Sequence, residues 1–297
     1  MSQLDRLTTE LANPRTVDVD RLDTLHVLER LNAEDLLVAP AVRTALPRLA
    51  SAVELALDRW QRGGRIALFG AGTSGRLALL DAAELGPTFG VPPERYVARL
   101  AGGANAFLQA VEGAEDDPHA GAVAASDLGP PDVAFGIAAS GRTPWVLGAL
   151  AAARERGAAT IGLACVPRPA LADHADVCIV VETGPEPIAG STRMKAGTAQ
   201  KLVLNAFSST LMIRLGKVYG NLMVDVQATN DKLRQRATRL VSDAAGVDAG
   251  TAAQALLDAN GAVKVAIAML RLNATAEEAA RRLQQADGRL RVVLGEA

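Results

Sequence analysis

The 297-residue sequence contains few aromatic residues and has no excess of either charge. Aromatic residues make up 3%, and 31 basic residues are offset by 33 acidic ones, which gives a formal net charge of −2. Binding of a nucleic acid normally requires a basic groove or a row of stacking aromatic side chains. The sequence contains no long basic block, so we expect no nucleic-acid partner.

The sequence is also poor in residues that form disulfides or bind metals, with two cysteines and three histidines. Cys165 and Cys178 lie in apolar runs, where free buried thiols are expected rather than a disulfide or a metal pair. His26, His119 and His174 stand in segments without companion ligands. We therefore expect no metal, no cofactor and a reducing, cytoplasmic environment.

We expect no targeting signal in the N-terminal stretch MSQLDRLTTELANPRTVDVDRL, which carries acidic residues from the start. It lacks the apolar core of a secretory signal peptide. No later segment is expected to reach a membrane-spanning apolar length. With 49% hydrophobic residues, the chain is expected to bury a large core, in one large domain and one small one.

Apolar periodicity predicts helices over residues 20–62 and then a change of pattern. Short apolar runs, separated by helical or turn-rich stretches, are typical of buried parallel strands in a sheet covered by helices on both faces. The predicted strands lie within residues 65–71, 95–102, 132–140, 159–165 and 176–183.

The pattern after Gly184 and Pro185 is helical and is expected to remain so to the end of the chain. Thr275 is the expected N-cap of a helix within a compact three-helix segment that starts near residue 248. We predict an N-terminal helical segment (1–62), an α/β domain (63–230) and a C-terminal helical appendage (231–297).

A glycine-rich turn, within LFGAGTSGRLALLDAAELGPTFG at residues 68–90, follows the first predicted strand. Its glycines have the G-x-G-x-x-G spacing of the dinucleotide-binding fingerprint, but two hydroxyl residues occupy the turn itself. Thr73 and Ser74 occupy the turn, which suits a phosphate monoester held by hydroxyls and helix N-terminal amides. Taken alone, such a turn is more often a plain helix cap.

A second hydroxyl-rich turn, in AASGRTPWVLGAL, precedes a helix expected to start near Pro144. Because the carboxyl ends of parallel strands lie at one edge of the sheet, both turns are expected to meet in one crevice. Together they favour phosphate binding. The candidate ligands are Thr73, Ser74, Gly75, Ser140, Gly141, Arg142 and Thr143.

Several motifs, in order along the chain, resemble the N-acetylmuramic acid 6-phosphate etherases, which belong to the SIS (sugar isomerase) fold group. They are AGTSGR with LDAAELGPTFG, VEGAED, SGRTPWV, GSTRMKAGTAQK and GKVYGNLMVDVQATNDKL. The resemblance covers essentially the whole chain; VEGAED and GSTRMKAGTAQK are its most specific parts. Gly86 departs from it, since the family would have proline there. The resemblance implies an α/β fold: a SIS-type parallel five-stranded sheet flanked by helices, with a small C-terminal three-helix, UBA-like appendage.

The activity implied by the resemblance is cleavage of the D-lactyl ether at C3 of the sugar phosphate, in cell-wall amino sugar recycling. Elimination followed by water addition would yield N-acetylglucosamine 6-phosphate and D-lactate. This route needs a base at C2 and an acid at the leaving oxygen, without a metal or a nicotinamide. By the resemblance, Glu84 is the acid and Glu115 the base, with Glu112 as the alternative to Glu115. Asp81 is expected to be a solvated charge.

The segment GSTRMKAGTAQK offers further polar groups. Ser191 and Thr192 are candidate substrate ligands, with capping of the following helix as the structural alternative. Arg193 and Lys195 are candidate cations for the phosphate or the lactyl carboxylate.

Two other functions remain open from the sequence: a noncatalytic sugar-phosphate-binding regulator and an aldose–ketose isomerase. The pair of glutamates favours the etherase, because a pure binding protein has no need of them. The apolar helix expected at residues 200–215 exceeds what one core usually needs. We therefore expect a symmetric homodimer in which residues of one subunit complete the pocket of the other.

Overall fold

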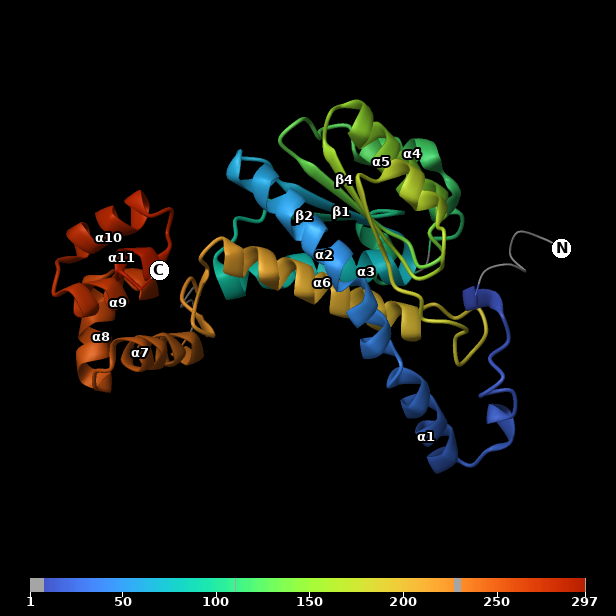
Figure 1. Ribbon diagram of the computed structural model, residues 1–297, viewed down its shortest axis with the longest axis horizontal. Helices are drawn as coiled ribbons and strands as arrows, with labels where there is room; N and C mark the ends of the chain where they lie inside the picture. Colours follow the sequence, from blue (N-terminus) through green and yellow to red (C-terminus); the bar gives the residue numbers. More distant parts are fainter. Residues whose placement is uncertain (1–7, 110, 227–230, 297) are drawn as a thin grey trace. The chain divides into compact units, whose positions relative to one another are not determined.

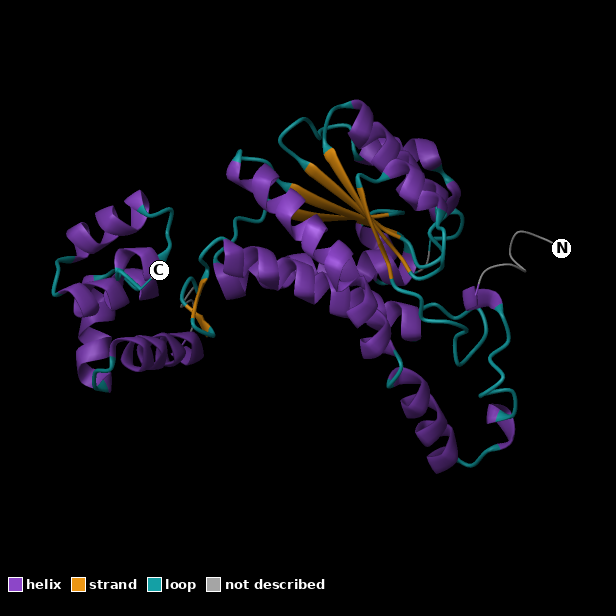
Figure 2. Ribbon diagram, in the orientation of Figure 1, coloured by secondary structure: helices purple, strands orange, loops and turns teal. Residues whose placement is uncertain are grey.

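A computed structural model describes residues 8–109, 111–226 and 231–296, and its centre is a parallel sheet (Figures 1 and 2). The strand order is β2-β1-β3-β4-β5, and every neighbouring pair is parallel. Each strand lies within its predicted run, so the predicted five-stranded sheet is confirmed. The strands are β1 (Ile66–Gly70), β2 (Tyr96–Leu100), β3 (Val133–Ile137), β4 (Ala159–Ala164) and β5 (Val177–Val180).

Helices pack on both faces of the sheet, and β1, β3 and β4 are therefore buried throughout. On one face Phe69 packs against Trp145 of α5, with ring centroids 5.9 Å apart. On the other, Phe135 meets Phe207 of α6 edge-on at 5.0 Å. The helices in this part of the chain are α1 (Thr24–Asp35), α2 (Val38–Gln61), α3 (Gly72–Phe89), α4 (Pro118–Ala124), α5 (Pro144–Glu155) and α6 (Lys195–Arg214).

Short 3₁₀ turns connect these elements. They are η2 (Thr8–Glu10), η3 (Val19–Arg21), η4 (Ala104–Phe107), η5 (Ala114–Asp116) and η6 (Ala170–His174).

One helical stretch, Thr24–Gln61, contains an 18-residue window with a mean hydropathy of 1.3, which is enough by length and composition to cross a membrane. The expectation that no segment reaches such a length was therefore wrong. However, α2 contacts β4 and β5 and buries Ala52, Val53 and Ala56. These contacts identify α2 as a core helix that covers the sheet, which explains its apolar composition.

Contacts divide the chain into two compact units: Met1–Ala82 with Glu94–Ser208, and Ala83–Pro93 with Ser209–Ala297. The second unit has its own core, which includes Val241, Ile267 and Leu283. Its elements are β6 (Val218–Tyr219), β7 (Leu222–Met223), α7 (Asp231–Ala245), α8 (Ala249–Asp258), α9 (Val263–Leu272), α10 (Ala276–Gln285) and α11 (Leu290–Val293).

The second unit contains one helix cap that was predicted from the sequence and one hairpin that was not. Thr275 caps α10 by accepting a hydrogen bond from the Glu278 backbone N–H at 3.3 Å, as predicted. The prediction of an unbroken helical pattern after residue 184 was wrong, because β6 and β7 form an antiparallel hairpin. Gly220, at the turn, has a φ of 59°, a conformation that glycine adopts without strain.

Candidate active site

Two helices begin at the carboxyl ends of neighbouring strands: α3 after β1, and α5 after β3. Glycines allow the first strand-to-helix connection to pack closely. A Cβ on Gly75 would lie 2.2 Å from Leu100 Cδ1 and 2.6 Å from the Gly70 carbonyl oxygen. Gly75 is therefore required for packing, and it is not among the residues that line the cavity.

Both hydroxyl-rich turns meet in one cavity of about 570 Å³. The cavity thus brings together residues from four of the predicted motifs. Its lining includes seven predicted site residues, namely Thr73, Ser74, Glu115, Ser140, Arg142, Thr143 and Thr192, with Glu10, Ala71, Gly72, Asp116, Ala139, Pro144 and Gly190 between them. Gly141 lies outside this lining. It is needed for close packing, since a Cβ there would lie 2.2 Å from Pro169 Cβ.

The start of α5 leaves polar groups available to a ligand. Thr143 is the N-cap of α5, yet its side chain makes no capping hydrogen bond. In the part of the chain that the structure describes, no hydrogen bond or ion pair engages the Arg142 guanidinium. A free hydroxyl, a helix N-terminus and a free cation in one cavity suit an anion such as a phosphate.

Ser74 differs from Thr143 because its hydroxyl already has a partner. It donates to Gln200 Oε1 on α6 at 2.9 Å, and the Ser74 side chain is buried. The buried Gln200 Nε2 has no hydrogen-bond partner among the described groups. Sequence reasoning missed Gln200, which lies inside the quoted GSTRMKAGTAQK motif but whose contact with Ser74 spans 126 positions.

Glu115 lies in η5, at the point where the main cavity meets a smaller one of about 260 Å³. Glu115 lines both cavities, whereas Glu112 lines only the smaller one. Arg76, which also lines the smaller cavity, anchors its wall by donating to the backbone carbonyls of Ala106 and Phe107 at 2.8 and 2.9 Å. The geometry thus favours Glu115 over Glu112 as the carboxylate that faces the hydroxyl-rich turns.

A further carboxylate, Glu10, lines the main cavity and was missed by sequence reasoning. Its segment is fixed by a backbone hydrogen bond from the Gly190 N–H to the Thr9 carbonyl, 2.9 Å long. Gly190 has a φ of 78°, and a Cβ there would lie 3.0 Å from Glu10 Oε2. In the sequence, Glu10 is marked only by its place in the segment TTELANPRT. That segment alone does not indicate a role for Glu10, because the loop before α6 that it contacts is distant in sequence.

Glu84 and Asp81 lie on α3 but in different surroundings. Glu84 is exposed and lines neither cavity. Asp81 is buried and accepts hydrogen bonds from the hydroxyls of Tyr96 at 2.9 Å and Ser208 at 3.0 Å. The expectation that Asp81 is a solvated charge was therefore wrong. Its burial raises the pKa of this carboxyl, which the two hydrogen bonds partly oppose.

Family comparisons agree with this architecture. Residues 48–154 match the N-terminal SIS domain of glucokinase regulatory protein, and residues 108–209 match the SIS domain. Residues 220–293 match the C-terminal lid domain of glucokinase regulatory protein. Among solved structures, protein c3406 of Escherichia coli CFT073 shares the fold at 18% identity, with a TM-score of 0.50 over 67% of this chain and 95% of that one.

Full-length relatives decide the family. The N-acetylmuramic acid 6-phosphate etherase of Deinococcus radiodurans is 52% identical over 98% of this chain and 96% of its own. That of Mycolicibacterium smegmatis is 50% identical over 98% of this chain and 99% of its own. The chain belongs to the N-acetylmuramic acid 6-phosphate etherase family. This confirms the resemblance, the SIS-type α/β fold and the assignment to a class of carbon–oxygen lyases.

In this etherase-family chain, Lys195, which was a candidate cation for the substrate, does not line the cavity. Its side chain is fully buried, and its Nζ pairs with Glu34 Oε2 at 2.7 Å. The structural alternative for Ser191 and Thr192, capping of α6, is filled instead by Glu186, which accepts hydrogen bonds from the backbone N–H groups of Lys195 and Ala196 at 2.8 and 2.9 Å. Ser191 and Arg193 do not line the cavity either, which leaves Thr192 as the lining residue of that motif.

Glu34 is the centre of a buried network that fixes this segment. Besides Lys195, it accepts from Asn13 Nδ2 at 2.8 Å and from Arg15 Nη2 at 2.9 Å, and Arg15 Nε also donates to it. These partners, Arg15 foremost, lower the pKa of Glu34 to about 2 although burial opposes the shift. The network ties α1 to the start of α6.

The described residues 8–109, 111–226 and 231–296 contain no group of three or more His, Cys, Asp or Glu side chains placed to hold a metal ion. Cys165 and Cys178 are both free. Burial raises the pKa of the Cys165 thiol to about 12 and that of Cys178 to about 11. Both are therefore protonated at neutral pH and unsuited to nucleophilic catalysis.

Proposed function

We propose that this protein cleaves the D-lactyl ether of N-acetylmuramic acid 6-phosphate, giving N-acetylglucosamine 6-phosphate and D-lactate in cell-wall amino sugar recycling. The observation that carries the proposal is the cavity in which the two hydroxyl-rich turns face Glu115. It pairs an anion-binding wall with a carboxylate able to act as a base. The full-length etherase relatives support the same assignment.

The 6-phosphate binds between the starts of α3 and α5 in this proposal. Thr73, Ser140 and Thr143 supply hydroxyls, Arg142 supplies a cation, and the helix N-termini supply unpaired amides. Because Ser74 already donates to Gln200, it would contribute through its backbone or as an acceptor. The phosphate is remote from the bond that breaks, so these contacts lower KM more than they raise kcat.

Elimination from the open-chain aldehyde is the chemistry that this cavity supports best. The aldehyde acidifies the C2 hydrogen, Glu115 removes it, and an acid protonates the ether oxygen as D-lactate leaves. Water then adds to C3 of the unsaturated aldehyde. We assign the acid to Glu84, from the family motif DAAEL, and propose that it reaches the cavity of the partner subunit in a homodimer.

A symmetric homodimer is supported by apolar side chains left uncovered in the first unit. Helix α6 buries Val203, Leu204 and Phe207 in its own core, but Leu202 and, on α3, Leu80 remain exposed. Such side chains gain most from association with a second copy. Sedimentation at micromolar concentration should show a dimer; a fully active monomer would contradict this part of the proposal. We place the protein in the cytoplasm, where the sugar phosphate would be formed.

The direct test is incubation with N-acetylmuramic acid 6-phosphate and measurement of released D-lactate. Unphosphorylated N-acetylmuramic acid should be a poor substrate, because it cannot use the phosphate wall. Equal efficiency on both sugars would refute the phosphate assignment. An aldose–ketose isomerase would instead form a ketose without lactate.

The roles of the two glutamates can be separated by exchange. Glu84→Gln should retain exchange of the C2 hydrogen in deuterated water while lactate release falls by roughly 10²-fold or more. Glu115→Gln should lose both. Loss of exchange in Glu84→Gln with retained release would reverse the two roles.

A noncatalytic regulator is the second candidate, because two parts of the chain match domains of glucokinase regulatory protein. A protein that only binds sugar phosphate would bind the substrate without releasing lactate. The three carboxylates that line the cavity, Glu10, Glu115 and Asp116, argue against this role. Carboxylates repel a phosphate, so a site that only binds the sugar phosphate would gain nothing from them, whereas an acid–base reaction needs them.

A further inference from the structure

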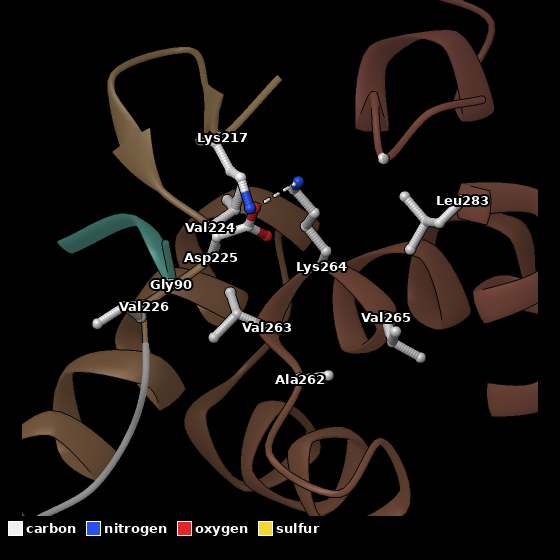
Figure 3. A pocket seen from close by; sticks show the side chains of 11 residues that line it. Gly90, Lys217, Val224, Asp225, Val226, Ala262, Val263, Lys264, Val265 and Leu283 are labelled. Carbon is white, nitrogen blue, oxygen red and sulfur yellow. Dashed lines mark hydrogen bonds and ion pairs between the residues drawn. The ribbon is translucent and has the colours of Figure 1, made fainter. Parts of the chain in front are cut away.

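A separate cavity of about 450 Å³ lies within the second unit and takes no part in the proposed reaction (Figure 3). Its volume is in the range of small-molecule sites. The lining residues come from the β6–β7 hairpin region, from the start of α9 and from the turn after α10. They are Gly90, Lys217, Val224, Asp225, Val226, Ala262, Val263, Lys264, Val265, Leu283 and Gly288.

Three charged side chains meet at one end of this cavity. Lys217 Nζ and Lys264 Nζ lie 2.9 and 2.8 Å from the same atom, Asp225 Oδ2. Figure 3 shows both lysines converging on the Asp225 carboxylate. Among the described lining residues Asp225 is the single acidic one, so one positive charge of the group is uncompensated by them.

This positive charge is held in a poorly solvated place. Only 11% of the Lys264 side chain is exposed. Desolvation lowers the pKa of Lys264, an effect that Asp225 opposes. Two ammonium groups at a single carboxylate oxygen repel each other, and in a buried setting water screens this repulsion poorly. An anion beside them would relieve it.

The start of α9 adds to the positive potential. Ala262 is its N-cap and supplies no side-chain hydrogen bond, so the first-turn N–H groups lack a side-chain acceptor. Ala262, Val263, Lys264 and Val265, which form this first turn, all line the cavity. A ten-residue helix directs the positive end of its dipole at this point.

The remaining walls are apolar and leave the charged end accessible. Val224, Val226 and Leu283 carry no polar side-chain atoms to compete for a bound anion. Gly288 lies beside the Lys264 ammonium, since a Cβ there would be 3.5 Å from its Nζ. A larger residue at 288 would crowd the cation.

We propose that this cavity binds a small organic oxyanion, a carboxylate or a phosphate monoester with a short apolar group, held by Lys217, Lys264 and the start of α9. The anion neutralises the excess charge, and the valines and Leu283 contact its apolar part. The site lies outside the cavity that contains Glu115 and does not depend on the proposed etherase activity.

The sequence offers a direct probe, because the chain has only five lysines: Lys195, Lys201, Lys217, Lys232 and Lys264. We suggest labelling the lysine Cε positions with ¹³C in the full-length protein and titrating separately with inorganic phosphate, acetate and D-lactate. The Lys217 and Lys264 signals, assigned from single substitutions, should shift saturably. No lysine lines the main cavity, so phosphate bound there does not produce these shifts.

Lys217→Met is the decisive variant, because it leaves Lys264 and Asp225 as a neutral pair and exposes no unpaired carboxylate. Binding should weaken by about tenfold or more, the loss expected for one charge-assisted contact. Arg239→Gln on α7 is the matched control: it also removes one positive charge from the second unit, but its side chain is exposed and lies outside the cavity.

Chloride at equal ionic strength completes the design. Saturable shifts with phosphate or the carboxylates, but not with chloride, support the site, and the stronger ligand identifies the source of the oxyanion. Equal shifts with all salts would show screening alone, and the absence of shifts at Lys217 and Lys264 would show no binding. Either result overturns the proposal, as would Lys217→Met binding as tightly as the parent.

Discussion

Replacing Glu34 with glutamine should destabilise the protein strongly and change how its stability depends on pH. Glu34 and Lys195 are both almost completely buried and form an ion pair with a 2.7 Å contact. Removing one partner leaves the other charge buried without compensation, which typically costs about 3–5 kcal/mol. We expect Glu34→Gln to lose a comparable amount of unfolding free energy at neutral pH.

The pH dependence provides a sharper test. The pKa of Glu34 is about 2 in the folded protein, compared with its usual 4.5. Because the folded pKa is depressed, the stabilisation is complete above pH 4.5 and is lost as the pH falls towards 2. At about 1.4 kcal/mol per pH unit, this difference corresponds to roughly 3 kcal/mol.

Urea unfolding of the parent and of Glu34→Gln between pH 7 and 3 measures this effect. The two unfolding free energies should approach each other as the pH falls. Asp127→Asn is the matched control: the Asp127 pKa is also about 2, but its side chain is half exposed, so its ion pairs contribute about 1 kcal/mol or less. A gap between parent and Glu34→Gln that stays constant with pH would refute the reasoning.

Two further predictions concern hydroxyl contacts. Ser74→Ala should lower the unfolding free energy by about 1–3 kcal/mol, because it leaves the buried Gln200 Oε1 unpaired. Ser140→Ala should instead raise KM and change the unfolding free energy by less than about 0.5 kcal/mol. Equal stability of the two variants in urea would contradict this. Asp81→Asn should cost about 1–3 kcal/mol, since its amide places a donor opposite the Tyr96 or Ser208 hydroxyl; unchanged thermal unfolding would show that this network contributes little.

The sheet and the positions of the two hydroxyl-rich turns could be predicted because their signals are local. A buried parallel strand is a short apolar run, and a helix start carries its hydroxyls and proline within a few positions. The hairpin at β6 and β7 also had a local signal, since Gly220 and Asn221 form a typical two-residue turn. It was missed because each strand has only two residues.

The errors at polar residues have a different cause. Whether Asp81 or Lys195 is solvated depends on partners that are distant in sequence: Ser208 lies 127 positions from Asp81, and Glu34 lies 161 from Lys195. A charged residue on a helix is usually exposed unless a partner is provided. The local pattern does not contain that partner, so a buried ion pair and a solvated charge look alike until the fold brings the segments together.

The position of Glu84 makes the assembly itself testable. Glu115 lines the cavity of its own chain, whereas Glu84 is exposed and does not. If each site combines Glu115 of one subunit with Glu84 of the other, inactive Glu84→Gln and Glu115→Gln proteins should complement each other when unfolded and refolded together. In a symmetric dimer, each mixed pair has one site with both substitutions and one site with neither.

Random assortment makes half of the dimers mixed, so about a quarter of the parental lactate-releasing activity should return. A mixture of Glu84→Gln with itself, refolded in the same way, is the control and should stay inactive. If both glutamates of a site came from one chain, every site in the mixture would carry one substitution and no activity would return. Recovery therefore requires both the dimer and the exchange of Glu84 between subunits, and its absence in refolded dimers would refute a shared site.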